Sequence, residues 1–209
     1  MAKIIKKGAE ANLYQIKWFG RPAIAKVRCR KKYRLAKLDR KIRQQRTVKE
    51  STIIHKARLS RVSVPIIYHV NPDKGEIIME MIDGINLKDY LNNNNYNSNL
   101  FKDIGEMIGR LHSNGIIHGD LTTSNIIIRN NKIYLIDFGL SMFSDRTEDQ
   151  GVDIKLIKAL LQSLHDPIAK KAFKAILQGY RNSIGNNETE EVLKVVKEIE
   201  RRGRYARVE

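Results

Sequence analysis

A chain of 209 residues with 42% hydrophobic residues is long enough to bury a substantial core, as one large domain or as two small lobes around a cleft. No apolar run approaches the roughly 20 residues that a bilayer-spanning helix needs, which argues against a membrane protein. The lone cysteine, Cys29, excludes an internal disulfide, and the start "MAKIIKKGAEAN" lacks a signal-peptide pattern, so we expect a cytoplasmic location.

The positive charge of the chain is concentrated in its first part. The formal net charge is +16, and residues 1–61 hold 20 Lys and Arg against 3 Asp and Glu, whereas the remaining residues hold 19 against 20. A one-sided basic field attracts polyanions through counterion release and steering. A solvated helix face is the alternative explanation, but the density of charge favours a polyanionic partner.

Residues 1–82 are predicted to form a small sheet with a helix. Strand-like segments are "KIIKKG", "NLYQIKWFG" and "PAIAKVRC", with a turn expected at Gly20-Arg21-Pro22. Apolar residues between 38 and 57 follow helical spacing, in segments that we expect to be interrupted near residues 46–49. The stretch "VPIIYHVNPDKGEIIMEMI" predicts two more strands joined by a turn at residues 71–75.

The pattern changes after Asp83-Gly84, which is the expected hinge between two lobes, 1–82 and 83–209. The stretch "NLKDYLNNNNYNSN" begins with a helical pattern and then becomes an Asn-rich loop, and helical spacing returns at residues 100–111. The runs "NIIIR" and "KIYLIDF" around Asn130-Asn131 predict a hairpin. Helices are expected at about 153–164, 167–182 and 188–202. The fold class is therefore α+β, with a small antiparallel sheet in the first lobe and a reduced, mostly helical second lobe.

The segment "HGDLTTSN" (118–125) and the later "DFG" carry the main chemical signal. Asp120 and Asn125 are five positions apart and Asp137 follows, which is the order of a protein-kinase catalytic loop and its metal-binding aspartate. Asp120 would orient the attacking group and accept its proton, while Asn125 and Asp137 would hold Mg²⁺ on the phosphates of ATP. The alternative is a strand-end turn with a capping Asp–Asn pair. His118 is expected to anchor the loop by packing and hydrogen bonding.

Upstream residues complete a nucleotide site. Lys26 in "AIAKV" resembles the phosphate-binding strand lysine, and Glu50 lies in the helical region where its pairing glutamate belongs. A surface lysine is the alternative for Lys26. In "IIMEMIDG", Met79 would be the gatekeeper and backbone groups of Glu80 and Ile82 would face adenine, although an ordinary strand end explains these residues too.

The sequence departs from the kinase pattern at two points. The glycine-rich loop is reduced to "KGAEA", so the phosphates would lie against Lys7, Gly8, Ala9, Glu10 and Ala11. Glu10 would shape this loop or meet a protein partner. Only residues 140–152 separate DFG from Asp153, and no A-P-E follows, so a conventional peptide-docking activation segment is not expected.

These motifs together resemble the small atypical kinase family of the KEOPS (EKC) complex. The resemblance rests on "KGAEA", Lys26, Glu50, "HGDLTTSN", "DFGLS" and the basic tail "RRGRYAR", and it covers nearly the whole chain. It implies a bilobal protein-kinase-like fold, Mg-ATP binding, autophosphorylation or ATPase activity, and support of threonylcarbamoyladenosine formation on tRNA.

The same resemblance implies partners and one bracing residue. Docking to the threonylcarbamoyl-transferase subunit is expected, and Asp153 would brace the catalytic loop. Contact with tRNA is expected through the basic first lobe and through the tail residues Arg201, Arg202, Arg204, Tyr205 and Arg207, although a frayed helix end also explains these charges.

Three functions remain open from the sequence. The first is a Mg-dependent ATPase and atypical serine/threonine kinase within a tRNA-modification complex. The second is a RIO-type or small-molecule kinase, for which the 72 residues after Asp137 (209 − 137) leave little room for an acceptor pocket. The third is a non-catalytic scaffold that binds RNA or protein, which the degenerate glycine loop favours and the intact Asp120, Asn125 and Asp137 disfavour.

Overall fold

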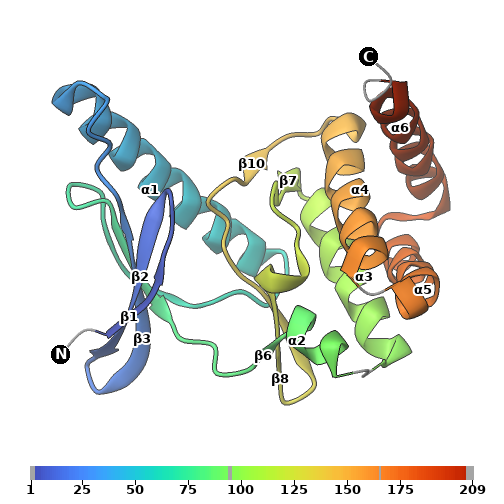
Figure 1. Cartoon of the computed structure of the whole chain (residues 1–209), viewed down its shortest axis with the longest axis horizontal. Helices are drawn as coiled ribbons and strands as arrows, with labels where there is room; N and C mark the ends of the chain where they lie inside the picture. The colour runs from blue at the N-terminus through green and yellow to red at the C-terminus, as the bar shows by residue number, and fades with distance from the viewer. Residues whose placement is uncertain (1–2, 94–95, 165, 206–209) are drawn as a thin grey trace. The chain divides into compact units, whose positions relative to one another are not determined.

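A computed structural model describes residues 3–93, 96–164 and 166–205. The chain divides into two compact units, one formed by Met1–Lys56 and Val64–Asp83, the other by Ala57–Ser63 and Gly84–Glu209. The first unit is built mainly of strands with one long helix, and the second is mainly helical (Figure 1). This architecture confirms the predicted α+β class.

One antiparallel sheet forms the first unit. Its strands lie in the order β1-β2-β3-β5-β4, with the bounds β1 Lys3–Lys7, β2 Ala11–Trp18, β3 Arg21–Arg28, β4 Ile67–Asn71 and β5 Glu76–Glu80. Ala23, Ala25 and Ile78 form a buried cluster on one face, covered by Tyr14, Ile16, Trp18 and Tyr68. Because side chains alternate along a strand, Ile24, Lys26 and Arg28 of β3 face the other way.

The turn between β2 and β3 lies earlier than predicted. Phe19 and Gly20 have φ of 47° and 80°, the left-handed conformation that a tight hairpin turn requires, and β3 begins at Arg21. The prediction of a turn at Gly20-Arg21-Pro22 was wrong because proline was taken as a turn residue. Pro22 fits the strand because β5 pairs only with Ala23–Val27, so no ladder bond to β5 needs its missing N–H.

The helix of the first unit, α1 (Ala36–Leu59), is continuous. The predicted interruption near residues 46–49 was therefore wrong. Thr47 is buried, and its hydroxyl donates to the carbonyl of Arg43 at 2.8 Å, which satisfies the polar group within the helix. Arg28 of β3 donates to the carbonyl of Arg46, and Lys26 and Arg28 bind Glu50, so tertiary contacts override the weak helix propensity of this segment.

The predicted β4–β5 hairpin is confirmed. Gly75 has φ of 66°, and its N–H donates to the carbonyl of Pro72 at 3.0 Å, which closes the turn. The side chain of Asn71 accepts from the N–H of Lys74 at 3.1 Å, a local bond typical of asparagine in turns.

The second unit contains the remaining elements. Its helices are α2 Leu87–Asn92, α3 Ser98–His112, η1 Thr123–Asn125, α4 Thr147–Leu164, α5 Asp166–Ile184 and α6 Asn186–Tyr205, and its short strands are β6 Ile85–Asn86, β7 Ile116–Ile117, β8 Ile126–Arg129, β9 Lys132–Leu135 and β10 Met142–Phe143. Helix α5 packs along α3, and α4 packs against α5 and α6 (Figure 1). Among the described residues, no helix combines the length and apolar character needed to cross a membrane.

Two details of this unit bear on the sequence predictions. The hairpin β8–β9 forms as expected, with Asn130 and Asn131 at φ of 48° and 59°. The helix predicted from about residue 153 begins instead at Thr147, because Glu148 and Asp149 in its first turn suit a helix N-terminus although they carry no apolar pattern. The segment that follows DFG is therefore even shorter than predicted.

Glycines allow α3 and α5 to approach closely. A Cβ at Gly105 would overlap the carbonyl oxygen of Ile176, and one at Gly179 would overlap the carbonyl oxygen of Lys102. Backbone atoms cannot move aside as a flexible side chain can, so the two helices would have to separate.

Gly179→Ala is therefore expected to destabilise the protein by about 3 kcal/mol, since overpacking outweighs the roughly 1 kcal/mol gain in helix propensity. Urea unfolding measures this change. Gln178→Ala, at the exposed neighbouring position of α5, is the control and should change stability by less than about 0.5 kcal/mol. Equal stability of the two variants would contradict the close helix contact.

Candidate active site

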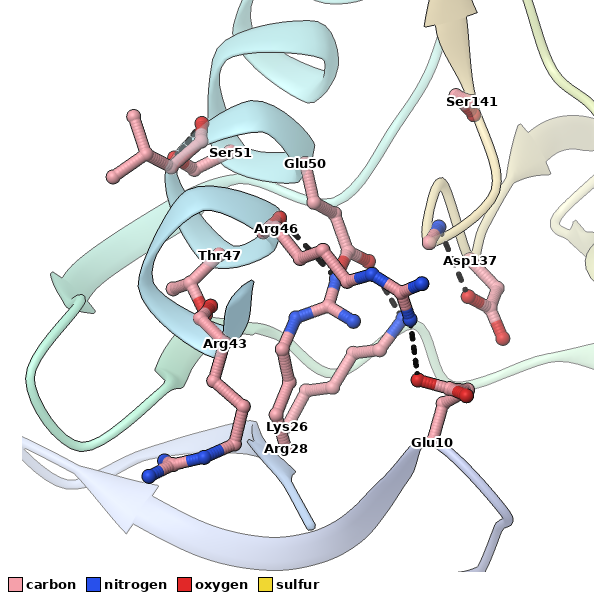
Figure 2. A network of polar contacts seen from close by, with 12 residues as sticks. Glu10, Lys26, Arg28, Arg43, Arg46, Thr47, Glu50, Ser51, Asp137 and Ser141 are labelled. Carbon is pink, nitrogen blue, oxygen red and sulfur yellow. Dashed lines mark hydrogen bonds and ion pairs between the residues drawn. The ribbon is translucent and has the colours of Figure 1, made fainter. Parts of the chain in front are cut away.

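Lys26 forms a buried ion pair in the first unit. Its Nζ lies 2.6 Å from Oε1 of Glu50, and the two residues are 7% and 2% exposed. Lys26 projects from β3 and Glu50 from α1 (Figure 2). The surface-lysine alternative is thus wrong, because Lys26 is buried on the sheet face opposite the alanine cluster. A lysine is rarely buried unless it is paired, as it is here with the Glu50 carboxylate.

Arg28 is a second cation on the same carboxylate, which the sequence analysis missed. Its Nη2 lies 2.5 Å from Oε2 of Glu50 and donates to the carbonyl of Arg46 at 3.3 Å. Within the part of the chain that is described, the buried Nε of Arg28 has no hydrogen-bond partner. The signal was present in the sequence, because residues two apart on a strand share a face and Lys26 and Arg28 are so spaced.

The loop "GAE" between β1 and β2 is fastened by side chains. Lys31 Nζ donates to the carbonyl of Ala9 at 2.5 Å, and Arg46 Nη1 binds the Glu10 carboxylate at 2.6 Å (Figure 2). The Gly8 N–H donates to the carbonyl of Ala11 at 3.1 Å, which tightens the turn. Glu10 therefore shapes the loop, one of the two roles that the sequence left open. Lys7 is exposed at the end of β1.

The segment expected to face adenine lies at the end of β5. Met79 and Ile82 are buried, with 9% and 8% exposure. The N–H of Glu80 donates to the carbonyl of Ile66 at 2.8 Å. That N–H is engaged within the sheet, so a contact of Glu80 with a purine would have to use another of its groups.

Asp120 and Asn125 are brought together in the second unit. The Asn125 amide nitrogen donates to the Asp120 carboxylate at 2.8 Å and to the Asp120 carbonyl at 2.9 Å. The one-turn helix η1 places Asn125 back beside Asp120. Because both bonds use the nitrogen, the Oδ1 atom of Asn125 is oriented away from them as a potential metal ligand.

A backbone hydrogen bond from the residue before Asp137 joins the Asp137 segment to this loop. The N–H of the preceding residue, Ile136, donates to the carbonyl of Asn125 at 2.9 Å. Asp137 itself has φ of 62°, and its carboxylate accepts from the Gly139 N–H at 3.3 Å (Figure 2). A left-handed aspartate costs energy and is typical of functional sites.

The donor set of Asn125 and Asp137 fits Mg²⁺. A carboxylate and an amide oxygen are hard ligands, and Mg²⁺ usually binds one or two protein ligands together with substrate phosphates. No group of three His, Cys, Asp or Glu side chains suited to a metal occurs among the described residues. The two side chains therefore fit a magnesium ion whose remaining ligands are phosphate oxygens and water.

His118 anchors the loop that carries Asp120, as the sequence predicts. Burial lowers its pKa and outweighs the nearby carboxylates, so the ring is neutral. The Nδ1 atom accepts from the Asp120 N–H at 3.3 Å, and Nε2–H donates to the Ile136 carbonyl at 3.2 Å. The ring also packs on Phe138 with centroids 4.7 Å apart. His118 thus joins the loop of Asp120 to the segment of Asp137.

Asp153 in α4 braces the same loop. Its carboxylate accepts from the N–H of His118 at 2.7 Å and of Gly119 at 2.9 Å, and His112 Nε2 lies 3.3 Å away. His112 Nδ1 in turn lies 2.7 Å from the hydroxyl of Tyr180. The sequence predicted Asp153 only through the family resemblance. It missed His112 and Tyr180, because helical periodicity indicates only that they are buried and gives no sign of their contact with the loop.

Asp153→Asn should destabilise the protein by about 2 kcal/mol at pH 7, because the buried N–H of His118 and the partly buried N–H of Gly119 lose a charged acceptor. Burial alone would raise the pKa of Asp153, but the bonds from His112 and the loop amides lower it below its usual value. This stabilisation is present above about pH 4 and is lost as pH falls through the folded-state pKa. The stability difference between variant and parent, measured by urea unfolding, should therefore shrink below pH 4.

The exposed Asp145 provides the control for this experiment. Asp145→Asn should leave stability within about 0.5 kcal/mol of the parent at every pH. A difference for Asp153→Asn that grows on acidification would contradict the role assigned to its carboxylate.

Comparison with known families supports the fold. Residues 7–159 match the protein kinase domain. Among solved structures, the chain is similar to the Rio2 kinase from Chaetomium thermophilum in its ADP/Mg²⁺-phosphoaspartate complex, with a TM-score of 0.65, 17% identity, and coverage of 94% of this chain and 69% of that one. It is also similar to WaaP in complex with acyl carrier protein, with a TM-score of 0.66, 12% identity, and coverage of 98% and 88%. At these identities the likeness concerns the fold alone.

Sequence relatives are much more similar. The KEOPS complex subunit Bud32 of Pyrococcus abyssi is 40% identical over 97% of this chain and 96% of its own length. A probable bifunctional tRNA threonylcarbamoyladenosine biosynthesis protein of Methanothermobacter thermautotrophicus is 44% identical over 97% of this chain, but the match spans only 36% of that protein. A protein of the same description from Methanobrevibacter smithii is 40% identical, again over 36% of its length.

Proposed function

The chain belongs to the Bud32 family of protein-kinase-like proteins, and on this basis we propose that it binds Mg-ATP and transfers or hydrolyses the γ-phosphate. The observation that carries the proposal is the pair of preorganised groups, Lys26 with Glu50 and Asp120 with Asn125, each held by hydrogen bonds at 2.6–2.9 Å. Phosphoryl transfer depends mainly on positioning and electrostatic stabilisation, which such groups provide.

Each residue has a definite role in this proposal. The ammonium of Lys26 binds the α- and β-phosphates, and Glu50 holds it in place. Asn125 and Asp137 hold Mg²⁺, which supplies neutralisation of the phosphate charge. Asp120 orients the attacking hydroxyl or water and accepts its proton. The loop from Lys7 to Ala11 covers the phosphates with backbone N–H groups, and Met79, Glu80 and Ile82 line the adenine site.

The proposed setting is a complex that forms threonylcarbamoyladenosine on tRNA. Support comes from the names of the relatives, and from the bifunctional proteins, in which this chain corresponds to only 36% of the length. We propose that this chain docks to a separate threonylcarbamoyl-transferase subunit, which corresponds to the remaining part of the bifunctional proteins. A cytoplasmic location, favoured by the single cysteine, belongs to the same proposal.

Contact with tRNA through the basic first lobe and the C-terminal tail is likewise proposed. Arg201 and Arg202 are exposed near the end of α6, and Arg202 is paired with Glu148 at 3.1 Å. Arg204 and Tyr205 belong to the last turn of α6, and Arg207 lies outside the described residues.

Labelled ATP tests this function. The purified chain is incubated with γ-labelled ATP and Mg²⁺, with and without tRNA and the partners recovered by pull-down. Release of free phosphate or labelling of protein, increased by the partners, is the expected result. Labelling of a soluble metabolite would favour a small-molecule kinase, and failure to bind nucleotide at all would favour a non-catalytic scaffold.

A further inference from the structure

A groove between α4 and α5 lies apart from the residues discussed so far. Its walls include Lys158, Lys170, Phe173, Lys174, Leu177 and Arg181, and its volume is about 230 Å³. Sites that enclose a whole small molecule usually measure about 300–1,000 Å³. This groove, called the α4–α5 groove below, is therefore suited to one part of a larger ligand.

The charges of the α4–α5 groove select an anion. Lys158 and Arg181 are held in place by acidic residues of α6, Glu200 at 2.7 Å and Glu190 at 2.6 Å. Lys170 and Lys174 are exposed, and neither forms an ion pair with any side chain that the structure describes. Like charges four residues apart on a helix repel each other, and an anionic ligand would reduce the repulsion between Lys170 and Lys174.

The floor of the α4–α5 groove is apolar and includes an aromatic ring. Phe173 is partly exposed, Leu177 follows it by four residues, and Lys158 Nζ lies 5.7 Å from the centre of the Phe173 ring. A partly exposed ring beside cations is a combination that binds single-stranded nucleic acid, through stacking of a base and neutralisation of phosphates.

The spacing of the cations fits a polymer rather than a single phosphate. Lys170, Lys174 and Arg181 lie on one side of α5, and Arg181 follows Lys170 by eleven positions, which corresponds to about 16 Å along the helix axis. This length spans several phosphates of a nucleic acid strand. An acidic protein would satisfy the cations but would have no need of the ring.

We propose that the α4–α5 groove binds a single-stranded segment of RNA, with a base against Phe173 and backbone phosphates at Lys170 and Lys174. The choice of RNA as the polyanion rests on the proposed function, whereas the groove and its charges do not. Binding can be measured without ATP, so failure of the groove and failure of the kinase reaction are distinguishable.

Fluorescence anisotropy with a labelled 12-nucleotide oligouridylate tests the proposal on the full chain. Lys170→Gln/Lys174→Gln should weaken binding about 10-fold and reduce the slope of log K against log salt by about 1.4, since each phosphate of a single strand contributes about 0.7. Phe173→Leu should weaken binding at least about 5-fold and leave that slope unchanged, because stacking releases no counterions.

The matched control is Lys194→Gln/Lys197→Gln, which removes the same charge from exposed positions of the neighbouring α6. It should retain most of the affinity. An equal loss of RNA affinity in both double variants would overturn the proposal, because it would show that RNA responds to the overall positive charge and not to the groove. Competition by polyaspartate as effective as that by unlabelled RNA, with no effect of Phe173→Leu, would overturn it in favour of an acidic protein. Circular dichroism of each variant checks that the fold is retained.

Discussion

Asp137→Asn is expected to lower the rate of ATP turnover about 1,000-fold. Loss of a carboxylate ligand removes several kcal/mol of charge stabilisation, and about 4 kcal/mol corresponds to a thousandfold in rate. Asparagine is chosen because it tolerates the left-handed conformation seen at this position, with φ of 62°. Phosphate release at saturating Mg-ATP measures the effect.

The control for this experiment is Asp145→Asn, which removes an exposed carboxylate a few residues further along the chain. Its turnover should match that of the parent. Asp120→Asn should fall by about 100- to 10,000-fold, the usual range for a lost general base. Turnover by Asp137→Asn within a few-fold of the parent would refute the assignment of Asp137 as a metal ligand.

Glu50→Gln is expected to lower the free energy of unfolding by about 3–5 kcal/mol, because it leaves two buried cations beside a neutral amide. Both Lys26 and Arg28 lie within 2.6 Å of the Glu50 carboxylate, and all three are nearly inaccessible to solvent. Lys26→Met should cost less, since Arg28 still neutralises the carboxylate. Urea unfolding measures which of the two variants loses more free energy of unfolding.

An exposed pair supplies the comparison. Glu10→Gln removes the carboxylate that binds Arg46, but these side chains are 50% and 42% exposed, so the loss should stay below about 1 kcal/mol. A larger loss for Lys26→Met than for Glu50→Gln would show that Arg28 does not share the carboxylate.

Elements with strong local signals were predictable from the sequence. The Asn130-Asn131 hairpin formed because asparagine tolerates two successive left-handed residues, and α3 formed because its apolar residues follow the helical period. The continuity of α1 through Thr47 was not predictable, since it depends on a buried hydroxyl and on the bonds that Lys26 and Arg28 of β3 make to this part of the helix.

The candidate site shows the same division. Motif spacing predicted Lys26, Asp120, Asn125 and Asp137, because chemistry restricts the residue types at those positions. Strand spacing could have predicted Arg28, whereas Arg46 and Tyr180 act through tertiary contacts that no motif encodes. The loop at Gly8 is the clearest case, because the glycine-rich motif of other kinases is missing. Here Arg46 of α1 binds Glu10, and Lys31, in the connection between β3 and α1, donates to the carbonyl of Ala9.

A crystal structure with Mg²⁺ and a non-hydrolysable ATP analogue tests the central claim most directly. The expected result is one nucleotide whose α- or β-phosphate contacts Lys26 Nζ and whose metal ion is bound by Asp137 and Asn125. A nucleotide bound without contact to Lys26, or a metal ion held away from Asp137, would contradict it.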